Sequence, residues 1–537
     1  MNCDVIFAEM PKRSQLLAEV LPDGLQKIRV NVHRNHSFEM IENAIAPFLA
    51  FAGLSAEFVY SDYDDSLNFY DLKPADLELL WLDVERYKNV DLSAFLKERI
   101  AFLQQKSKAP VLLVYTGERD LSGLKDAGLL NFALFDAFDA AGKLGKDMFD
   151  LAKEPFSGTR LSNKASILLA QKLGLQYIRA LLKPNLKAVA VDLDNTLYEG
   201  ILGEDGIDNL VLTEAHRKLQ EEIKKLKEKG FFIAVASKNE EEDARKMFAR
   251  REDFPLRFED FTTVKINWDG KAGNIAAAAK DLNIGTDAIL FIDDNPAEIQ
   301  NVEMAGLNVK TILASSPEKA LRELCLYPGM LKLKSSSEDA IRNKDIQANL
   351  ERQNLAKQLS PEEYFKKLGI KLEIVVNPFS RIGRVSELLR KTNQFIYNYR
   401  RYTESEVEAL MKAQSSCIVT AAMSDNLSDS GIIAILAAKR DSGNRLVVDE
   451  MTVSCRALGR NIENPMLFTL LKAAQQKLAC GDEVIWPYKQ GERNMPALNW
   501  LQNIVKQKIA GDGEAALAMP SGINTNGLKL IIREEEE

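Results

Sequence analysis

Three apolar runs of the sequence end in polar side chains, and this pattern restricts the possible folds more than any other feature. The first run ends in Asp192 and Asp194, the second in Ser237, and the third in Asp293 and Asp294. Buried runs of this length, separated by helical stretches, are typical of a parallel sheet covered by helices. Ligands of open α/β sheets bind at the carboxyl edge of the strands. The sequence therefore predicts an α/β fold with a polar site at that edge.

The chemistry of these side chains suits a phosphate ester. In an extended segment, residues two apart share a side, so Asp192 and Asp194 can face one pocket. Clustered carboxylate oxygens suit Mg²⁺, and a carboxylate can attack phosphorus to form an aspartyl-phosphate. Lys271, near a predicted helix start, would offset charge on the transferred group. A lone Asp-x-Asp at a strand end is more often a solvated loop, but several such elements in order favour a site.

Composition excludes several classes of protein. The net charge of −8 gives no overall reason to expect nucleic-acid binding. No apolar run approaches the length of about 20 residues that a membrane-spanning helix needs, so we expect no membrane segment and a cytoplasmic location. The five cysteines are scattered and lack Cys-x-x-Cys spacing, which favours reduced thiols over a zinc site.

The alternation of strand-like and helix-like runs predicts a three-domain α/β chain. The expected parts are 1–183, an α/β domain; 184–330, the central parallel sheet; 331–365, a charged helical connector; and 366–537, an α+β domain. Between Asp192 and Ser237, and again between Ser237 and Lys271, the spacing leaves no room for a separate cap domain. Water must then be excluded by another domain or by the substrate, and an open site suits a phosphate carried on something large.

A second candidate site lies in the C-terminal part, in a strand, turn and helix. Arg456, Gly459 and Arg460 lie in the turn, where backbone N–H groups at a helix start can bind phosphate. The turn resembles the pyrophosphate-binding loop of GNAT-type acyltransferases. Cys455 lies beside these cations, which favour the thiolate, although a lone cysteine in a strand is more often buried and structural.

A basic segment with interleaved tyrosines precedes that turn, at 381–402. It has two interpretations: a solvated helix face, or an anion-binding surface for a phosphopantetheine arm or an acidic protein. The charge balance of the whole chain does not favour nucleic acid as its partner.

The central motifs resemble those of the HAD superfamily. The resemblance implies that Asp192 is the nucleophile and Asp194 the general acid/base. It implies Mg²⁺ held by Asp192, the backbone carbonyl of Asp194 and Asp293, with Asp294 in support. The phosphate-binding residues that it implies are Thr196, Ser237, Lys238, Asn239 and Lys271.

Longer runs resemble the FkbH-like family, the subfamily IIIC glyceryl transferase/phosphatases of secondary-metabolite (polyketide) biosynthesis. The runs include DLDNTLYEGILGEDGI, ASKNEEEDA, INWDGKAGNI, FIDDNPAE, RKTNQF and SCRALGRNIE. This resemblance implies that a glyceryl unit passes from 1,3-bisphosphoglycerate to the thiol of an acyl carrier protein, with Cys455 as thioester carrier. The acyl- or pantetheine-binding residues that it implies are Arg456, Gly459, Arg460, Asn393, Gln394 and Asn494.

The N-terminal part resembles an SGNH-hydrolase-like, flavodoxin-like domain, with Ser37 in the place of a nucleophilic serine. Such a serine needs a histidine base near the end of the domain, and 38–215 contain no histidine. His33 and His36 immediately precede Ser37, and His216, at the start of a charged predicted helix, is expected at the surface. We therefore expect a degenerate hydrolase domain used for docking.

Two other functions remain open at this point. The chain can be a plain Mg²⁺-dependent phosphatase of a small sugar or metabolite phosphate, or a non-catalytic assembly protein. The complete set of Asp, Ser and Lys motifs argues against the second of these alternatives.

Overall fold

The structure is a computed structural model of the 537-residue chain. It describes residues 1–70, 72–333, 348, 352, 355, 359–392, 394–454, 457–458, 462–491, 493–520, 522–523 and 528–535. The expected connector at 331–365 therefore lies largely outside the described residues. No helix among the described residues has the length and apolar character needed to cross a membrane.

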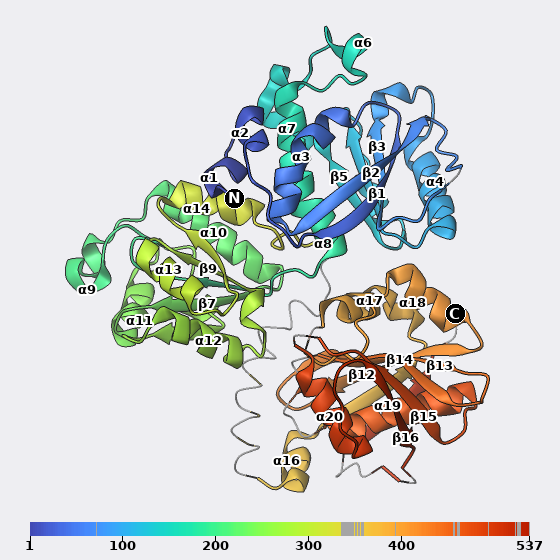
Figure 1. Cartoon of the computed structure of the whole chain (residues 1–537). Coiled ribbons are helices and arrows are strands. Elements are labelled where there is room, and N and C mark those ends of the chain that lie inside the picture. The colour runs from blue at the N-terminus through green and yellow to red at the C-terminus, as the bar shows by residue number, and fades with distance from the viewer. Residues whose placement is uncertain are drawn as a thin grey trace. The chain divides into compact units, whose positions relative to one another are not determined.

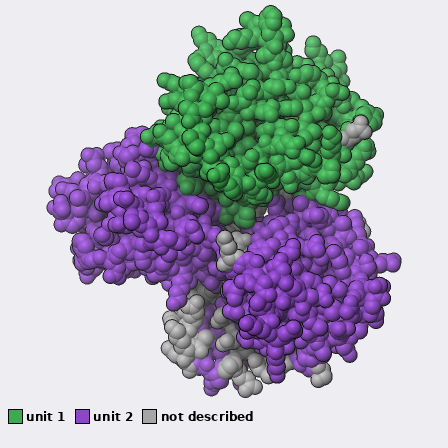
Figure 2. All heavy atoms as spheres, in the orientation of Figure 1, with its two compact units in different colours: residues 1–185, 321–333 green, residues 186–320, 334–537 purple. Residues whose placement is uncertain are grey.

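The chain forms two compact units (Figure 2). Unit 1 contains Met1–Asn185 and Leu321–Leu333, and unit 2 contains Leu186–Ala320 and Lys334–Glu537. The break at residue 185 is close to the expected boundary. The sequence pattern did not indicate that Leu321–Leu333 belongs to unit 1.

Unit 1 is built on a five-stranded parallel sheet with the order β2-β1-β3-β4-β5, the flavodoxin-like doubly wound order (Figure 1). Its strands are β1 (Gln26–Arg34), β2 (Leu54–Tyr63), β3 (Leu77–Asp83), β4 (Val111–Thr116) and β5 (Phe132–Asp136). Every residue of β3 and β4 is buried, as expected for central strands covered on both faces.

Helices cover both faces of this sheet. The helices of unit 1 are α1 (Cys3–Ile6), α2 (Arg13–Leu17), α3 (Glu39–Phe51), α4 (Leu92–Lys106), α5 (Ala137–Ala141), α6 (Glu154–Ser157), α7 (Asn163–Lys172) and α8 (Ile178–Leu182), of which α6 has no buried residue. The apolar face of α4 packs with β3 and β4 in one core cluster. The π-helical turn Leu173–Tyr177 joins α7 to α8 and places Gly174 against α3.

The segment Leu321–Leu333 is tied to unit 1 by side chains and backbone. Arg322 Nε donates to the carbonyl of Phe7 at 2.8 Å, and Gln176 Nε2 donates to the carbonyl of Cys325 at 2.7 Å. The ring of Tyr327 stacks on Phe7 with centroids 5.9 Å apart. These contacts explain why the segment leaves the central sheet.

The first sheet of unit 2 is also parallel and five-stranded, with the order β10-β9-β6-β7-β8. Its strands are β6 (Ala188–Val191), β7 (Phe232–Ser237), β8 (Thr263–Ile266), β9 (Ile289–Asp293) and β10 (Lys310–Leu313). The accompanying helices are α9 (Leu202–Asp205), α10 (Glu214–Glu228), α11 (Glu241–Arg250), α12 (Lys271–Asp281) and α13 (Pro296–Met304). The next helix, α14 (Pro317–Leu326), begins in unit 2 and belongs to unit 1 from Leu321 onward. The expected parallel sheet is confirmed.

The second sheet of unit 2 is mixed and seven-stranded, with the order β16-β15-β14-β13-β12-β11-β17. Its strands are β11 (Lys371–Val376), β12 (Ser416–Ser424), β13 (Asp429–Arg440), β14 (Leu446–Val453), β15 (Glu483–Tyr488), β16 (Gly513–Ala518) and β17 (Lys529–Glu534). The helices are α16 (Pro361–Leu368), α17 (Ile382–Lys391), α18 (Glu404–Lys412), α19 (Glu463–Leu478) and α20 (Met495–Val505). The mixed sheet agrees with the expected α/β class, and the GNAT-like assignment stays a prediction.

The contact of Gly174 with α3 predicts a stability effect. A Cβ added at Gly174 would lie 2.7 Å from Phe48 Cβ and 3.1 Å from Leu49 N. We expect Gly174→Ala to destabilise unit 1 by about 1–3 kcal/mol, because overpacking forces neighbouring atoms apart. Amide hydrogen exchange in β1 and β3 measures this change. Gly123→Ala, where a Cβ would meet nothing within 4 Å, is the control. Equal exchange rates in the two variants would contradict the expectation.

Candidate active site

Three carboxylates meet at the carboxyl edge of the parallel sheet in unit 2. Because β6 pairs with β9 in the register Val191↔Ile292, the next residues, Asp192 and Asp293, emerge side by side. Asp294 follows, and one oxygen from each of the three carboxylates lies within 4.8 Å of the others. The sequence predicted this group, and the strand register accounts for it.

The ammonium of Lys271 bridges two of these carboxylates. It lies 3.0 Å from Asp192 Oδ1 and 2.5 Å from Asp293 Oδ2. Lys271 is the first residue of α12, which follows the edge strand β8, and only 5% of its surface is exposed. The helix start therefore delivers a buried cation to the strand ends.

Burial dominates the electrostatics of the cluster. It raises the pKa of Asp192 to about 6, although Lys271 acts in the opposite direction. Burial also raises the pKa of Asp293, and burial together with the charge of Asp192 raises that of Asp294. For Lys271, burial lowers the pKa, but the two carboxylates outweigh burial and the pKa ends above its ordinary value.

The charge balance of this cluster fits a divalent cation. Three buried or half-buried carboxylates face one ammonium, which leaves an excess of negative charge that burial makes costly. The ligand atoms are all hard oxygens at a spacing that one small ion can span. Asp192, Asp293 and Asp294 are thus the side chains that could hold Mg²⁺.

The Asp194 side chain is not part of that cluster and accepts three hydrogen bonds. Its Oδ1 accepts from Tyr198 Oη at 2.7 Å and from the backbone N–H of Leu202 at 3.0 Å. Its Oδ2 accepts from Asn239 Nδ2 at 2.8 Å. The predicted metal contact of Asp194 was its backbone carbonyl, and its side chain is not one of the three clustered carboxylates.

The predicted phosphate-binding residues have different surroundings. Ser237 is buried at the end of β7, hydrogen-bonds Asp192, and accepts from Asn239 Nδ2 at 3.2 Å. Thr196 instead contacts Asp294, accepting from its backbone N–H at 3.1 Å. Lys238 pairs with Glu298 at 2.6 Å. Ser237 and Lys271 therefore contact the carboxylate cluster directly, and Asn239 reaches it through Ser237. Thr196 supports Asp294, and Lys238 pairs with Glu298 of α13.

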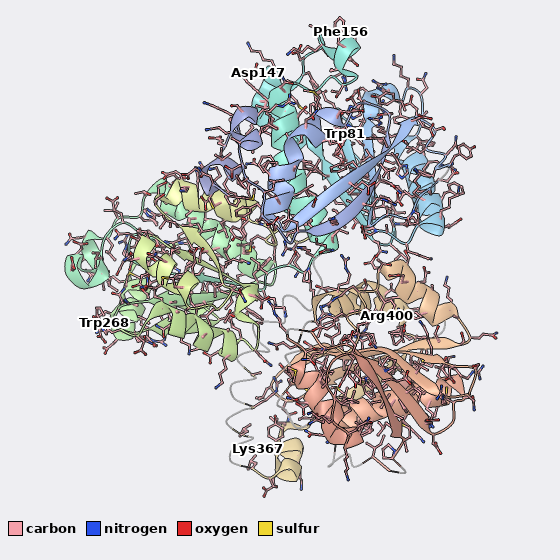
Figure 3. All side chains as sticks on the ribbon, viewed as in Figure 1. Trp81, Asp147, Phe156, Trp268, Lys367 and Arg400 are labelled. Atoms are coloured by element: carbon pink, nitrogen blue, oxygen red, sulfur yellow. The ribbon has the colours of Figure 1, made fainter. Side chains whose placement is uncertain are left out.

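Sequence reasoning missed Tyr198 and Trp268 and misjudged His216. Trp268 precedes Lys271 and is 69% exposed at the periphery in Figure 3, where its Nε1 donates to Glu240 at 2.7 Å. His216 was expected at the surface, but it is buried, and its Nδ1 lies 2.8 Å from the Thr213 hydroxyl that caps α10. The expectation was wrong because the first turn of α10 packs inward.

Ser37 of unit 1 lies at the end of β1 without a histidine partner. Its hydroxyl donates to Glu39 at 2.5 Å. The imidazole of His36 instead contacts the Thr159 hydroxyl and stacks on Trp81, and burial lowers its pKa to about 3. His33 pairs with Glu78 at 2.8 Å. This geometry fits the expectation that the serine is not activated by a histidine.

Most of the second candidate site lies outside the described residues: Cys455, Arg456, Gly459, Arg460 and Asn393. Asn494 is described and fully buried. Its Nδ2 donates to the carbonyls of Ile396 and Lys489, and its Oδ1 accepts from the N–H of Gly491. Asn494 therefore holds two loops together through its whole amide group.

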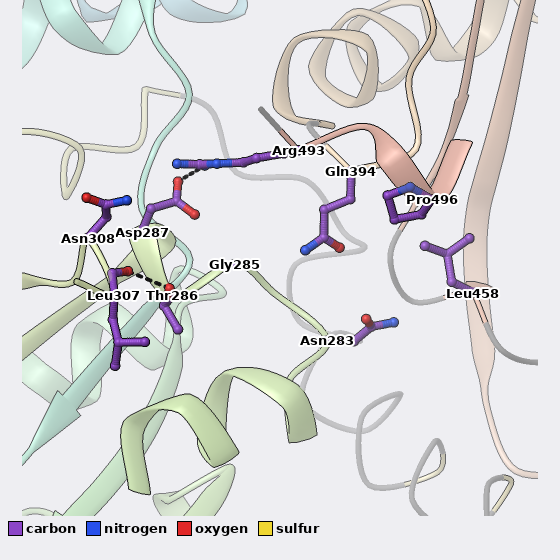
Figure 4. A pocket seen from close by; sticks show the side chains of 10 residues that line it. All are labelled: Asn283, Gly285, Thr286, Asp287, Leu307, Asn308, Gln394, Leu458, Arg493 and Pro496. Atoms are coloured by element: carbon purple, nitrogen blue, oxygen red, sulfur yellow. Dashed lines mark hydrogen bonds and ion pairs between the residues drawn. The ribbon is translucent and has the colours of Figure 1, made fainter. Parts of the chain in front are cut away.

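Gln394 lines the pocket drawn in Figure 4. In this pocket Arg493 pairs with Asp287, and Thr286 Oγ1 donates to the carbonyl of Leu307 at 2.5 Å. Thr286 and Asp287 precede β9, so they lie at the amino edge of the strand that ends in Asp293. The pocket is therefore separate from the carboxylate cluster.

Replacement of Lys271, whose ammonium bridges two of the carboxylates, tests the electrostatics of the cluster. We expect Lys271→Met to lower the opening free energy of β6 and β9 by about 3–5 kcal/mol, because it leaves buried carboxylates without their partner. Hydrogen exchange resolved to these strands measures the change. Lys265→Met is the control, since its pair with Asp281 is partly exposed and worth about 1 kcal/mol or less. A loss no larger than that of the control would contradict the expectation.

A second prediction concerns Glu450 in β14, which accepts from the backbone N–H groups of Tyr397, Asn398 and Arg400. Burial raises its pKa from 4.5 to about 7. The folded chain then holds the proton more tightly than the unfolded chain, so this contribution is complete below about pH 4.5 and is lost as the pH rises through about 7. We expect β14 to open more readily at pH 8 than at pH 5, by hydrogen exchange corrected for intrinsic rates. The same pH dependence in Glu450→Gln would contradict this assignment.

No family model matches the chain, and no curated protein matches it. Among solved structures, it is similar to the N-terminal part of the protein BF1531 from Bacteroides fragilis, described as containing a phosphatase domain complexed with Mg. The identity is 22% and the TM-score 0.48, over 63% of this chain and 99% of that chain.

A second structure is described as a GCN5-related glucosamine N-acetyltransferase region of a fungal multi-domain GH3 β-N-acetylglucosaminidase. Its identity to this chain is 9% and the TM-score 0.13, over 84% of this chain and 58% of that chain.

Proposed function

We propose that this chain is a Mg²⁺-dependent phosphatase of the HAD type, with Asp192 as its nucleophile. The observation that carries the proposal is the cluster of Asp192, Asp293, Asp294 and Lys271 at the carboxyl edge of a parallel sheet. Asp192 is the carboxylate that contacts both the Lys271 ammonium and Ser237. It is thus placed to attack a phosphorus held between them.

In the first step, a carboxylate oxygen of Asp192 bonds to phosphorus while the bond from phosphorus to the leaving oxygen breaks. Asp194 acts as the general acid and gives a proton to that oxygen, so the leaving group departs as a neutral alcohol. Lys271, Ser237 and Asn239 bind the transferred group and stabilise its charge.

In the second step, water attacks the aspartyl-phosphate and the bond between Asp192 and phosphorus breaks. Asp194, now ionised, takes the proton of the attacking water, and inorganic phosphate leaves. The residues that would hold Mg²⁺ are Asp192, Asp293 and Asp294, with the backbone carbonyl of Asp194. When bound, the ion supplies charge neutralisation at the phosphoryl oxygens.

The surroundings of this site favour a substrate carried on a larger molecule. Residues 186–320 are all described, and between β6 and β8 they form the flap 195–211, α10, β7, α11 and the short 3-10 helix Phe258–Asp260. No inserted domain within them covers the carboxylates. A phosphate at the end of an arm reaches such a site without a lid opening.

A finer proposal follows the family resemblance: the chain loads a glyceryl unit from 1,3-bisphosphoglycerate onto an acyl carrier protein. Cys455 thiolate would attack the acyl carbon and release phosphate, and the carrier thiol would then displace Cys455. The carboxylate site would remove the remaining phosphate monoester. Support for this proposal comes from the sequence motifs and from the uncapped site.

Replacement of the nucleophile tests the coarse proposal. We expect Asp192→Asn to reduce phosphate release from p-nitrophenyl phosphate by about 10³-fold or more, because an amide cannot form the acyl phosphate. Release by the unaltered chain should also stop on chelation of Mg²⁺. Asp281→Asn, whose partner is Lys265, is the control for charge removal in the same sheet domain. Full activity of Asp192→Asn would rule out this nucleophile.

Intact-protein mass spectrometry tests the finer proposal. We incubate an acyl carrier protein with the chain, Mg²⁺ and 1,3-bisphosphoglycerate. The carrier should gain a glyceryl mass with the unaltered chain, a phosphoglyceryl mass with Asp192→Asn, and no mass with Cys455→Ser. Phosphate release that depends on Asp192, without any mass gain on the carrier, would instead identify a plain phosphatase.

A further inference from the structure

We propose that Tyr198 is a positioning residue that orients Asp194 so that the proton of the reaction passes through Asp194 Oδ2. This inference rests on the proposed phosphatase function and adds to it the role of the flap 195–211. The phenol of Tyr198 donates to Asp194 Oδ1 at 2.7 Å, and the N–H of Leu202, also in the flap, donates to the same oxygen.

The three hydrogen-bond donors occupy three lone-pair positions of the Asp194 carboxylate and leave a fourth without a described donor. An ionised carboxylate offers about four lone-pair positions, two on each oxygen. Tyr198 and Leu202 occupy Oδ1, whereas Oδ2 has one described donor, Asn239. Asn239 also contacts Ser237, which hydrogen-bonds the nucleophile Asp192. Oδ2 is therefore the oxygen with room for a proton, and it lies on the side of the phosphate-binding residues.

The phenol is held in place by packing as well as by its hydrogen bond. Tyr198 is fully buried, and its ring stacks on Phe254 with centroids 5.7 Å apart. A ring enclosed in this way cannot follow a rotating carboxylate, so Asp194 must align with the ring.

The flap is anchored independently of Asp194. Glu199 and Val211 exchange backbone hydrogen bonds at 2.9 and 3.0 Å across its base. Gln220 of α10 donates to the carbonyl of Leu197 at 2.8 Å, and Arg251 donates to that of Leu210 at 2.6 Å. The position of the Tyr198 hydroxyl is thus set by α10 and α11, and through it these helices set the orientation of Asp194.

A leaving-group comparison separates positioning from a general structural role. Phenyl phosphate and p-nitrophenyl phosphate are similar in shape, but only the poorer leaving group, phenolate, depends strongly on a proton from Asp194. We expect Tyr198→Phe to lower kcat on phenyl phosphate by about 10–100-fold, part of the usual contribution of a general acid. On p-nitrophenyl phosphate we expect a loss of about threefold or less, because nitrophenolate needs less protonation.

A double-mutant cycle provides the second readout. If Tyr198 acts through Asp194, Tyr198→Phe should cost nothing further on phenyl phosphate in an Asp194→Asn background. Tyr115→Phe is the matched control, since Tyr115 is a buried tyrosine that donates to a carboxylate, Asp136, at the same distance of 2.7 Å in unit 1. It should leave both rates unchanged.

Equal losses on the two esters, or additive losses in the double variant, would overturn the positioning role while leaving the phosphatase proposal in place. Failure of the unaltered chain to release Asp192-dependent phosphate from either ester would instead overturn the phosphatase proposal, and the Tyr198 inference with it.

Discussion

The ion pair between the buried ammonium of Lys271 and the carboxylates of Asp192 and Asp293 is the interaction on which the candidate site depends. Two parallel strands bring these carboxylates to adjacent positions, where their mutual repulsion and their desolvation both oppose ionisation. The Lys271 ammonium offsets part of the free-energy cost of ionising these carboxylates, and a bound divalent ion would offset the rest. The fold thus concentrates negative charge at one edge of the sheet, where a bound cation would reduce the repulsion.

The positions of the three clustered carboxylates could be predicted from sequence because they depend on strand ends. Apolar runs identify strands, parallel strands end at one edge, and Asp192, Asp293 and Asp294 follow directly. The orientation of neighbouring side chains could not be predicted in this way. Whether Thr196 faces phosphate or Asp294, and whether Lys238 faces phosphate or Glu298, depends on contacts between segments far apart in sequence.

Tyr198 and Asn494 both show that the role of a side chain cannot be inferred from the sequence alone. Tyr198 lies in an irregular segment with no periodicity to mark it, and its role is visible only where the flap folds over Asp194. The family resemblance implied a binding role for Asn494, yet both ends of its amide are bound to the backbone. A sequence motif therefore identifies an important position. Only the three-dimensional contacts show whether its side chain has a chemical or a structural role.

The return of Leu321–Leu333 to unit 1 has a consequence for synthesis of the chain. Unit 1 is discontinuous in sequence, with the whole first sheet of unit 2 between its two pieces. On the ribosome, the N-terminal sheet can form early, but Tyr327 and Arg322 reach Phe7 only after that second sheet has been translated. For the time needed to translate about 135 residues at roughly 5–20 residues per second, the surface around Phe7 stays uncovered in the nascent chain. Completion of the first unit is thereby coupled in time to the appearance of the second.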